Sequence, residues 1–320
     1  MSTPAPLCLT MGSPEGIGGE ITLKSWLARK HSDVPVFFSL DVPERLREEA
    51  KRLELSVPVE EIATPSQAGG IFERALPVLP VSADKSDARA ALESIKGAVS
   101  FALKGEIAGL VTNPVNKASI SQTGVKFYGH TDYIAELCNA AGKAVMMLEC
   151  EALRVVPASV HIPLREAGAF LSQEWLEHVG RTVDAYLRER IGISGPIVAF
   201  AGFNPHAGEE GILGDEEIGI IKPAVESLRL NGIDARGPFA ADSLFHAEAR
   251  KTYDAAVCMY HDQALIPFKS LAFYEGVNVT LGLPVVRVSP DHGTAEDIKG
   301  KGVARPDSLL AALRTAARMR

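Results

Sequence analysis

Short runs of apolar and β-branched residues alternate along this chain with longer segments in which apolar residues recur every three or four positions. The alternation predicts a mainly parallel β-sheet with helices packed on it, because two parallel strands must be joined by a crossover that is usually a helix. Strands are expected at runs that include residues 7–11, 34–39, 107–112, 197–201 and 255–260. The predicted fold class is therefore α/β.

One helix can be placed with particular clarity. It is expected to begin after Asp215 and to end at Asn231-Gly232, where a turn-forming pair stops the periodic pattern. The positions predicted to form its apolar face are Ile218, Ile221, Val225 and Leu228.

The chain has 320 residues, which is long enough for two lobes. No internal repeat and no long linker divides it, so the lobes are expected to be interwoven along the sequence rather than strung in series. We predict a first lobe from residues 1–128 and 290–320, and a second from residues 129–289.

The charge of the chain limits its partners. The formal net charge is −7 and no run of Lys and Arg is present, so nothing in the sequence favours a nucleic acid or an anionic membrane as a partner. The first ten residues lack the pattern of a signal peptide, and no later run approaches the length of a membrane span. We expect a cytoplasmic protein.

Three histidines, His161, His206 and His261, each follow a predicted strand. Ligands of open α/β sheets bind beyond the carboxyl ends of the strands, so these imidazoles could converge on one divalent metal ion. The alternative is that each is a hydrogen-bonding residue with no ligand, and the spacing along the chain does not decide between them. His31, His178 and His246 lie in polar helical stretches and receive no role.

A possible anion site lies where Gly129-His130-Thr131-Asp132 opens a helix. Thr131 is expected at the N-cap and Asp132 in the first turn. A phosphate could bind the backbone N–H groups there with help from His130 and the Thr131 hydroxyl, although a plain helix cap explains the same residues.

Lys269, Asn278 and Arg287 are polar residues inside apolar segments. A charge in a buried strand must be paired or must face a ligand, so Arg287 is expected either in an internal ion pair or as a clamp on a carboxylate or phosphate. Lys269 could polarise an alcohol or a carbonyl, or extend its ammonium group to solvent.

Two loops contain several glycines. The loop at residues 12–20 does not fit the G-x-G-x-x-G pattern of a dinucleotide-binding turn. The loop at residues 291–302 comes just before the last helix, and its backbone could line a nucleotide or simply cap the domain.

Six blocks of this sequence, taken in order, resemble the 4-hydroxythreonine-4-phosphate dehydrogenase family of vitamin B6 synthesis. They are Gly129-His130-Thr131, Val160-His161-Ile162-Pro163-Leu164-Arg165, Asn204-Pro205-His206-Ala207-Gly208-Glu209, Met259-Tyr260-His261-Asp262-Gln263, Val277-Asn278-Val279-Thr280-Leu281-Gly282-Leu283-Pro284 and Asp291-His292-Gly293-Thr294-Ala295. The resemblance covers nearly the whole chain, and the set is specific although no single block is.

The resemblance implies the fold of the isocitrate and isopropylmalate dehydrogenases, with two α/β lobes and an active-site cleft between them. It further implies a homodimer whose active sites draw residues from both subunits. The first lobe is then the cofactor side, and the second lobe carries the metal, the substrate and the dimer interface.

The resemblance also assigns residues to roles. It implies that His161, His206 and His261 hold one divalent ion, zinc, cobalt or magnesium. It implies NAD or NADP as the cofactor, contacted by Asp291, His292, Gly293, Thr294 and Asp297. The implied substrate contacts are His130, Thr131, Lys269, Asn278 and Arg287, and we expect Asp262 or Lys269 to handle the proton.

The implied reaction is the oxidation of 4-phosphonooxy-L-threonine to a β-keto acid that loses CO₂ to give 3-amino-2-oxopropyl phosphate. Ser13, Glu15, Gly19 and Ala264 depart from the usual family pattern, which leaves cofactor preference and fine substrate choice open. One alternative is a paralogue that oxidises D-threonate or D-erythronate 4-phosphate, or a diol. Remoter alternatives are a phosphate acyltransferase of related fold and a non-catalytic ligand-binding protein.

Overall fold

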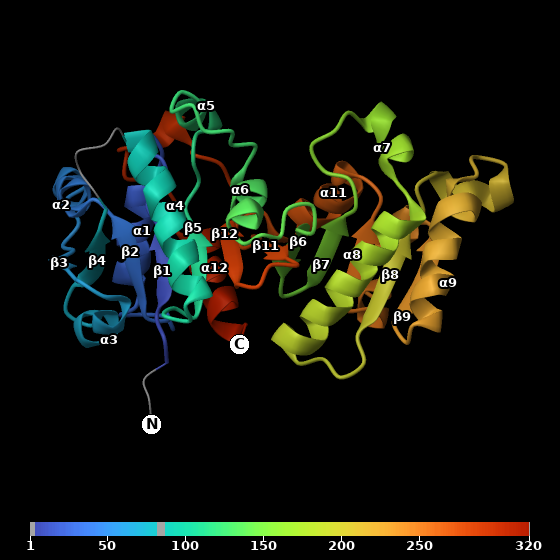
Figure 1. Cartoon of the computed structure of the whole chain (residues 1–320), viewed down its shortest axis with the longest axis horizontal. Helices are drawn as coiled ribbons and strands as arrows, with labels where there is room; N and C mark the ends of the chain where they lie inside the picture. The colour runs from blue at the N-terminus through green and yellow to red at the C-terminus, as the bar shows by residue number, and fades with distance from the viewer. Residues whose placement is uncertain (1–3, 82–86, 320) are drawn as a thin grey trace. The chain divides into compact units, whose positions relative to one another are not determined.

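The computed structural model of the chain describes residues 4–81 and 87–319 (Figure 1). These residues divide between two compact units, one within Met1–Ala144 and Leu283–Arg320 and the other Val145–Gly282. The sequence placed the changes of lobe near Tyr128 and Ser289. The difference arises because the segment after Tyr128 packs its Tyr133, Ile134 and Cys138 side chains into the core of the first unit.

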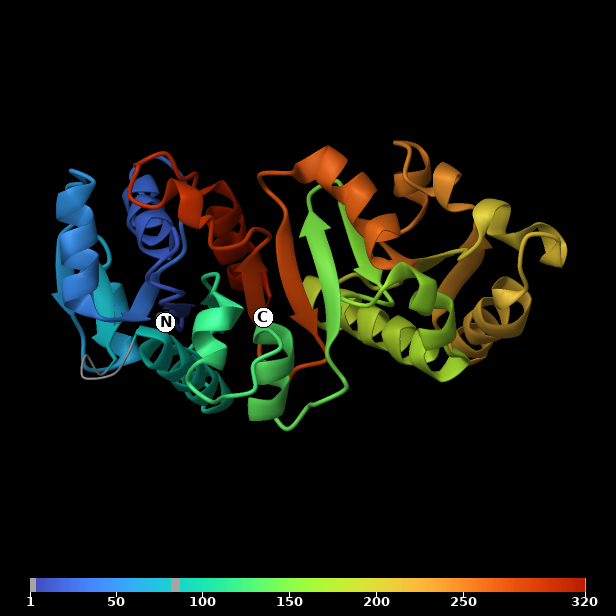
Figure 2. The same cartoon turned by 90° about the horizontal axis from the view of Figure 1, so that it is seen from above.

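The first unit is built on six parallel strands in the order β3-β4-β2-β1-β5-β12. Figure 2 shows α1 and α12 on one face of these strands and α4 with α6 on the other. The strands are β1 (Leu7–Thr10), β2 (Phe37–Asp41), β3 (Val59–Glu61), β4 (Leu76–Pro80), β5 (Gly109–Thr112) and β12 (Arg287–Pro290). The α-helices are α1 (Gly18–Ala28), α2 (Pro43–Arg52), α3 (Ala68–Ile71), α4 (Asp87–Leu103), α5 (Lys117–Ser121), α6 (His130–Leu137) and α12 (Asp307–Arg318).

The second unit has the strand order β11-β6-β7-β10-β8-β9. β6 is antiparallel to both of its neighbours, β11 and β7, and the other neighbouring strands pair in parallel. In Figure 2, α11 covers one face of its strands and α8 with α9 covers the other. The strands are β6 (Val145–Cys150), β7 (Leu153–Pro157), β8 (Ile197–Ala201), β9 (Asp234–Phe239), β10 (Ala255–Cys258) and β11 (Val277–Leu281). The α-helices are α7 (Leu164–Phe170), α8 (Gln173–Tyr186), α9 (Lys222–Leu230), α10 (Ala241–Leu244) and α11 (His261–Ala272).

Shorter helical turns complete the two units. They are η1 (Pro65–Gln67), η2 (Leu187–Ile191), η3 (Pro205–Gly211), η4 (Glu217–Ile221), η5 (Ala249–Thr252) and η6 (Glu296–Ile298). Across residues 4–81 and 87–319, no helix is both long enough and apolar enough to cross a membrane.

The α/β fold class is confirmed, and the five runs named from the sequence form β1, β2, β5, β8 and β10. The helix expected after Asp215 is also found, as η4 followed by α9, and it ends at Asn231. One detail of that prediction was wrong. η4 is a turn of π-helix, in which one turn contains more residues than in an α-helix, so the buried face is displaced along the sequence. Ile218 is therefore 47% exposed, while Ile221, Val225 and Leu228 are buried.

Candidate functional site

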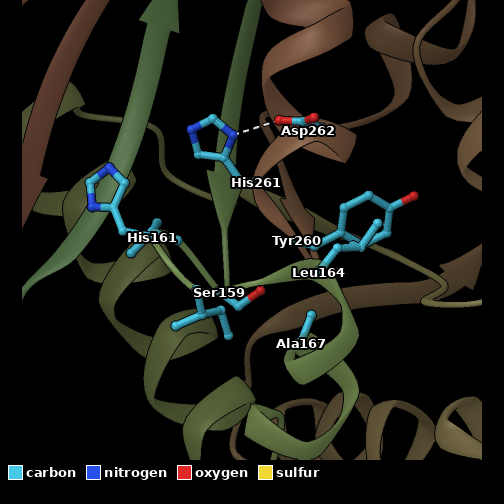
Figure 3. A pocket seen from close by; sticks show the side chains of 9 residues that line it. Ser159, His161, Leu164, Ala167, Tyr260, His261 and Asp262 are labelled. Atoms are coloured by element: carbon cyan, nitrogen blue, oxygen red, sulfur yellow. Dashed lines mark hydrogen bonds and ion pairs between the residues drawn. The ribbon is translucent and has the colours of Figure 1, made fainter.

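Two of the three histidines lie together in the second unit, at the carboxyl ends of neighbouring strands. β7 and β10 pair in parallel, with Val155 opposite Ala256 and Pro157 opposite Cys258, so both strands end at the same edge. His161 follows the last residue of β7 by four residues, and His261, the first residue of α11, follows the last residue of β10 by three. The two imidazole ring centroids are therefore 6.1 Å apart (Figure 3).

These imidazoles line a pocket of about 290 Å³, together with Ser159, Tyr260 and Asp262. Oδ1 of Asp262 lies 2.7 Å from Nδ1 of His261, and Figure 3 shows the carboxylate on the side of the His261 ring away from His161. A carboxylate that accepts the Nδ1 hydrogen leaves the Nε2 lone pair available, which is the arrangement found around metal-bound histidines. The donors of this pocket fit a divalent ion that binds imidazole nitrogen.

Hydrogen bonds between the strand ends fix the base of this pocket. The Ala158 backbone N–H donates to the Cys258 carbonyl over 2.7 Å, and the Ser159 hydroxyl donates to the Met259 carbonyl over 2.8 Å. Gln263 adds a link to a third strand. Its Oε1 accepts from the Met259 backbone N–H over 2.7 Å, while its Nε2 donates to the Gly202 carbonyl at the end of β8 over 2.8 Å.

His206 lies in η3, after β8, and its side chain is exposed. Four non-glycine residues of this turn, His206, Ala207, Glu209 and Glu210, have φ between 42° and 61°. The left-handed conformation costs about 1–2 kcal/mol per residue for an L-amino acid, so the surrounding structure must hold it. The buried Glu217 carboxylate provides part of that restraint, since its Oε1 accepts from the Phe203 and Asn204 backbone N–H groups at 2.7 Å each.

The structure thus brings His161 and His261 into one pocket and leaves His206 outside it. Within the part of the chain that is described, no group of three His, Cys, Asp or Glu side chains is arranged to hold a metal ion. His206 is not among the residues that line this pocket.

Arg287 forms the centre of a second cluster, which lies in the first unit. It begins β12, pairs with Leu110 of β5, and is only 3% exposed. Its Nη2 donates to Oγ1 of Thr112 over 2.7 Å. Burial lowers the pKa of Arg287 to about 10, so the guanidinium remains charged at neutral pH in a position that favours an anionic ligand.

His130 lies beside Arg287. Burial lowers the pKa of His130 well below its usual value, and the charges of Arg287 and Lys117 lower that pKa further. Its Nε2 is inaccessible to solvent and has no hydrogen-bond partner in the described chain. The N-cap of α6 is Gly129 rather than the expected Thr131, since the helix already begins at His130, and Asp132 lies in the first turn as predicted.

Lys269 and Asn278 belong to the second unit. Lys269 lies on α11, half-buried, with its Nζ 5.4 Å from the centroid of the Phe273 ring. Asn278 lies on β11 opposite Leu148 of β6, and its Oδ1 is buried without a hydrogen-bond partner among the described residues.

The loop expected to contact the cofactor is held against α1 in the first unit. The Ile17 backbone N–H donates to the Thr294 carbonyl over 3.0 Å, and a Cβ on Gly16 would lie only 2.8 Å from that oxygen. At the other end of the loop, Lys24 Nζ donates to the Gly302 and Ala304 carbonyls.

Of the expected cofactor contacts, Asp291 and His292 are half-buried, as is Thr294, whereas Gly293 and Asp297 are exposed. Gly293 has no heavy atom within 4 Å of the position that a Cβ would take. The backbone of this loop is therefore accessible where a dinucleotide would be expected to lie.

Sequence reasoning missed several residues that shape these clusters: Thr112, Lys117, Glu217 and, as a connector, Gln263. Their roles depend on hydrogen bonds and charges between segments far apart in the chain, such as Gln263 with Gly202. One signal could have found two of them, because Thr112 and Lys117 flank the end of a predicted strand, where α/β proteins place ligand contacts.

Comparisons with known proteins agree with this architecture. Residues 35–316 match the family model described as pyridoxal phosphate biosynthetic protein PdxA. The 4-hydroxythreonine-4-phosphate dehydrogenase of Methylorubrum populi is 50% identical over 329 residues, which cover 98% of this chain and 94% of that relative.

Solved structures give the same result. The crystal structure of 4-hydroxythreonine-4-phosphate dehydrogenase from Klebsiella pneumoniae matches with a TM-score of 0.88 at 34% identity and covers 98% of each chain. A terephthalate 1,2-cis-dihydrodiol dehydrogenase from Burkholderia xenovorans matches less well, with a TM-score of 0.68 at 26% identity over 99% of this chain and 98% of the other. The class defined by these likenesses is that of the α/β dehydrogenases. Within it, this chain belongs to the 4-hydroxythreonine-4-phosphate dehydrogenase family, PdxA.

Proposed function

We propose that this chain oxidises 4-phosphonooxy-L-threonine with NAD or NADP in pyridoxal 5'-phosphate biosynthesis. The observation that carries the proposal is the pocket in which His161 and His261, from two neighbouring strands, lie 6.1 Å apart with Asp262 bound to one of them. Full-length relatives of that activity support the choice of substrate. A cytoplasmic location is part of the same proposal.

His161, His206 and His261 are the residues that would hold the divalent ion, whether zinc, cobalt or magnesium. When bound, such an ion polarises the substrate's alcohol and the ketone formed from it as a Lewis acid. Asp262 holds His261 in the tautomer that presents Nε2 to the pocket.

The first-unit cluster would bind the phosphate of the substrate. Arg287 supplies a buried guanidinium, His130 an imidazole of lowered pKa, and Thr131 a hydroxyl in the first turn of α6. Lys269 and Asn278 are proposed as the substrate contacts of the second unit. The buried Oδ1 of Asn278 lacks a partner in the described chain, which is consistent with a ligand supplying one.

The loop containing Asp291, His292, Gly293, Thr294 and Asp297 is proposed to bind the dinucleotide. Its attachment to Ile17 and Lys24 would hold its backbone in place when the cofactor binds. The choice between NAD and NADP is measured by comparing kcat/KM for the two cofactors.

A bound dinucleotide would accept hydride from the carbinol carbon, and Lys269 or Asp262 would take the hydroxyl proton. The β-keto acid then loses CO₂, and its electron pair remains as an enolate. Protonation of that enolate gives 3-amino-2-oxopropyl phosphate.

In a homodimer with shared sites, each subunit would supply its His206 to the pocket of the other subunit. His206 lies outside the pocket of His161 and His261 in its own chain, as it would if it served the partner's pocket. Mixing His206→Ala with His161→Ala protein tests this. If sites are shared, each mixed dimer has one intact site, so about one quarter of wild-type activity should return. No recovery would show that the three histidines do not act across a dimer.

The first experiment is NADH formation at 340 nm with 4-phosphonooxy-L-threonine and NAD⁺, with and without a chelator. Chelator-sensitive turnover supports the proposal. Turnover of D-threonate 4-phosphate alone would keep the chemistry and change the substrate, and no turnover of either would overturn the proposed function. His161→Ala and His261→Ala should lose bound metal, whereas His178→Ala on α8 should retain it.

A further inference from the structure

Lys117 lies next to the proposed phosphate site but has no assigned role. It is the first residue of α5, and a Cβ built on Gly129 would lie 3.8 Å from its Nζ. The turn that opens α6 and carries His130 therefore faces this ammonium group. No hydrogen bond or ion pair engages that group in the described parts of the chain.

The backbone at Lys117 is fixed by its neighbour, Asn116. The Asn116 backbone N–H donates to Oγ of Ser13 over 2.7 Å, and its side-chain Oδ1 accepts from the Ala118 N–H over 2.9 Å. Its Nδ2 donates to Oε1 of Glu296 over 2.8 Å. Lys117 thus extends its ammonium group from a turn that is held by these three hydrogen bonds.

Charge balance gives this cation a function. A phosphate monoester carries between about 1.5 and 2 negative charges at neutral pH. Arg287 provides one positive charge, and His130 does not provide a second because its pKa is lowered by burial and by the two neighbouring cations. The exposed Asp132, whose Oδ2 is 4.0 Å from the same Gly129 position, adds a negative charge to this turn and increases the need for a second cation.

We propose that Lys117 binds the phosphate group of the substrate and supplies the second positive charge of the site, beside Arg287. This inference rests on the proposed function, since it assigns a contact within the same phosphate site. It predicts that Lys117 contributes to the binding of a phosphorylated substrate and contributes nothing to the binding of a substrate that lacks the phosphate.

The test compares Lys117→Gln with Lys117→Arg and with the control Lys126→Gln, an exposed lysine of the same connecting segment. With 4-phosphonooxy-L-threonine and saturating NAD⁺, Lys117→Gln should raise KM about 10- to 100-fold, the usual effect of losing a charge-assisted hydrogen bond. Lys117→Arg should recover most of that loss, and Lys126→Gln should match the wild type.

A second substrate separates binding from a structural effect. With unphosphorylated 4-hydroxy-L-threonine, Lys117→Gln and wild type should have the same kcat/KM. An equal loss on both substrates, or a Lys117→Gln KM within twofold of wild type on the phosphorylated one, would overturn the inference. Failure of the proposed function is distinguishable, because wild-type protein would then not turn over 4-phosphonooxy-L-threonine at all.

Discussion

Oδ1 of Asp262 lies 2.7 Å from Nδ1 of His261, on the same imidazole whose centroid is 6.1 Å from that of His161. The two residues are adjacent in the first turn of α11, so the contact is built into the helix rather than dependent on a distant segment. A carboxylate in this position orients its histidine and fixes the tautomer. Asp262 is therefore better suited to act through His261 than to accept the substrate's proton itself.

Replacing Asp262 tests which of these roles it has. Asp262→Ala should weaken metal binding about 10- to 100-fold, because that is the usual effect of losing a carboxylate behind a metal-bound histidine. Asp262→Asn keeps an oxygen that can accept the Nδ1 hydrogen and should bind metal with intermediate affinity. Metal titration against a chelating indicator measures both. If the two variants bind metal like the wild type and both lose the same ionisation from the pH–rate profile, Asp262 is the proton acceptor instead.

The lowered pKa of His130 predicts how stability changes with pH. In the folded chain this pKa lies below that of the unfolded chain, so the unfolded state binds the proton first as the pH falls. Stability should be full above about pH 6.5 and should fall below it by at most about 1.4 kcal/mol per pH unit. His130→Asn removes this pH-dependent contribution. The difference between the unfolding free energies of the variant and the wild type, measured with urea, should therefore change between pH 7.5 and 5.5. The exposed His246→Asn is the control. An unchanged difference would contradict the lowered pKa.

The strands and the histidine positions could be predicted because both depend on local pattern. Apolar runs identified β10, which precedes His261, and β8, which precedes His206. A residue that directly follows a parallel strand lies at the edge of the sheet where ligands bind. Which strands are adjacent could not be predicted, since 100 residues separate His161 from His261 and only the pairing of β7 with β10 brings them together.

Glu217 shows why other parts of the site were missed. A constant helical period places Ile218 on the apolar face, but the π-helical turn η4 shifts that face so that Glu217 is 1% exposed and Ile218 is 47% exposed. The buried carboxylate then receives the backbone N–H groups that follow β8. A periodic pattern contains no information on a partner that lies 13 or 14 residues away.

Gln263 should contribute to stability as well as to the position of the pocket. Its side chain is buried and bonds the backbone at the ends of β10 and β8. Gln263→Leu leaves the Met259 N–H and the Gly202 carbonyl without partners, which should cost about 2–4 kcal/mol. Gln173→Leu is the matched control, because the Gln173 side chain donates to Glu177 one turn away on α8, and its loss should cost less than about 0.5 kcal/mol. Equal unfolding free energies for the two variants would show that the hydrogen bonds of Gln263 do not stabilise the fold.

The contact between the two glycine-containing loops predicts a separable effect on the cofactor. A Cβ on Gly16 would lie 2.8 Å from the Thr294 carbonyl, so Gly16→Ala must move the loop at residues 291–302 away from Ile17. Since that loop is the proposed dinucleotide site, KM for NAD⁺ should rise at least about tenfold, while metal content, which depends on the second unit, stays unchanged. Gly293→Ala tests the same loop at a position with no atom within 4 Å of the added methyl group, and it should be folded like the wild type. If Gly16→Ala lowers metal content and cofactor binding together, its effect is on folding as a whole, and the loop contact is not specific to the cofactor.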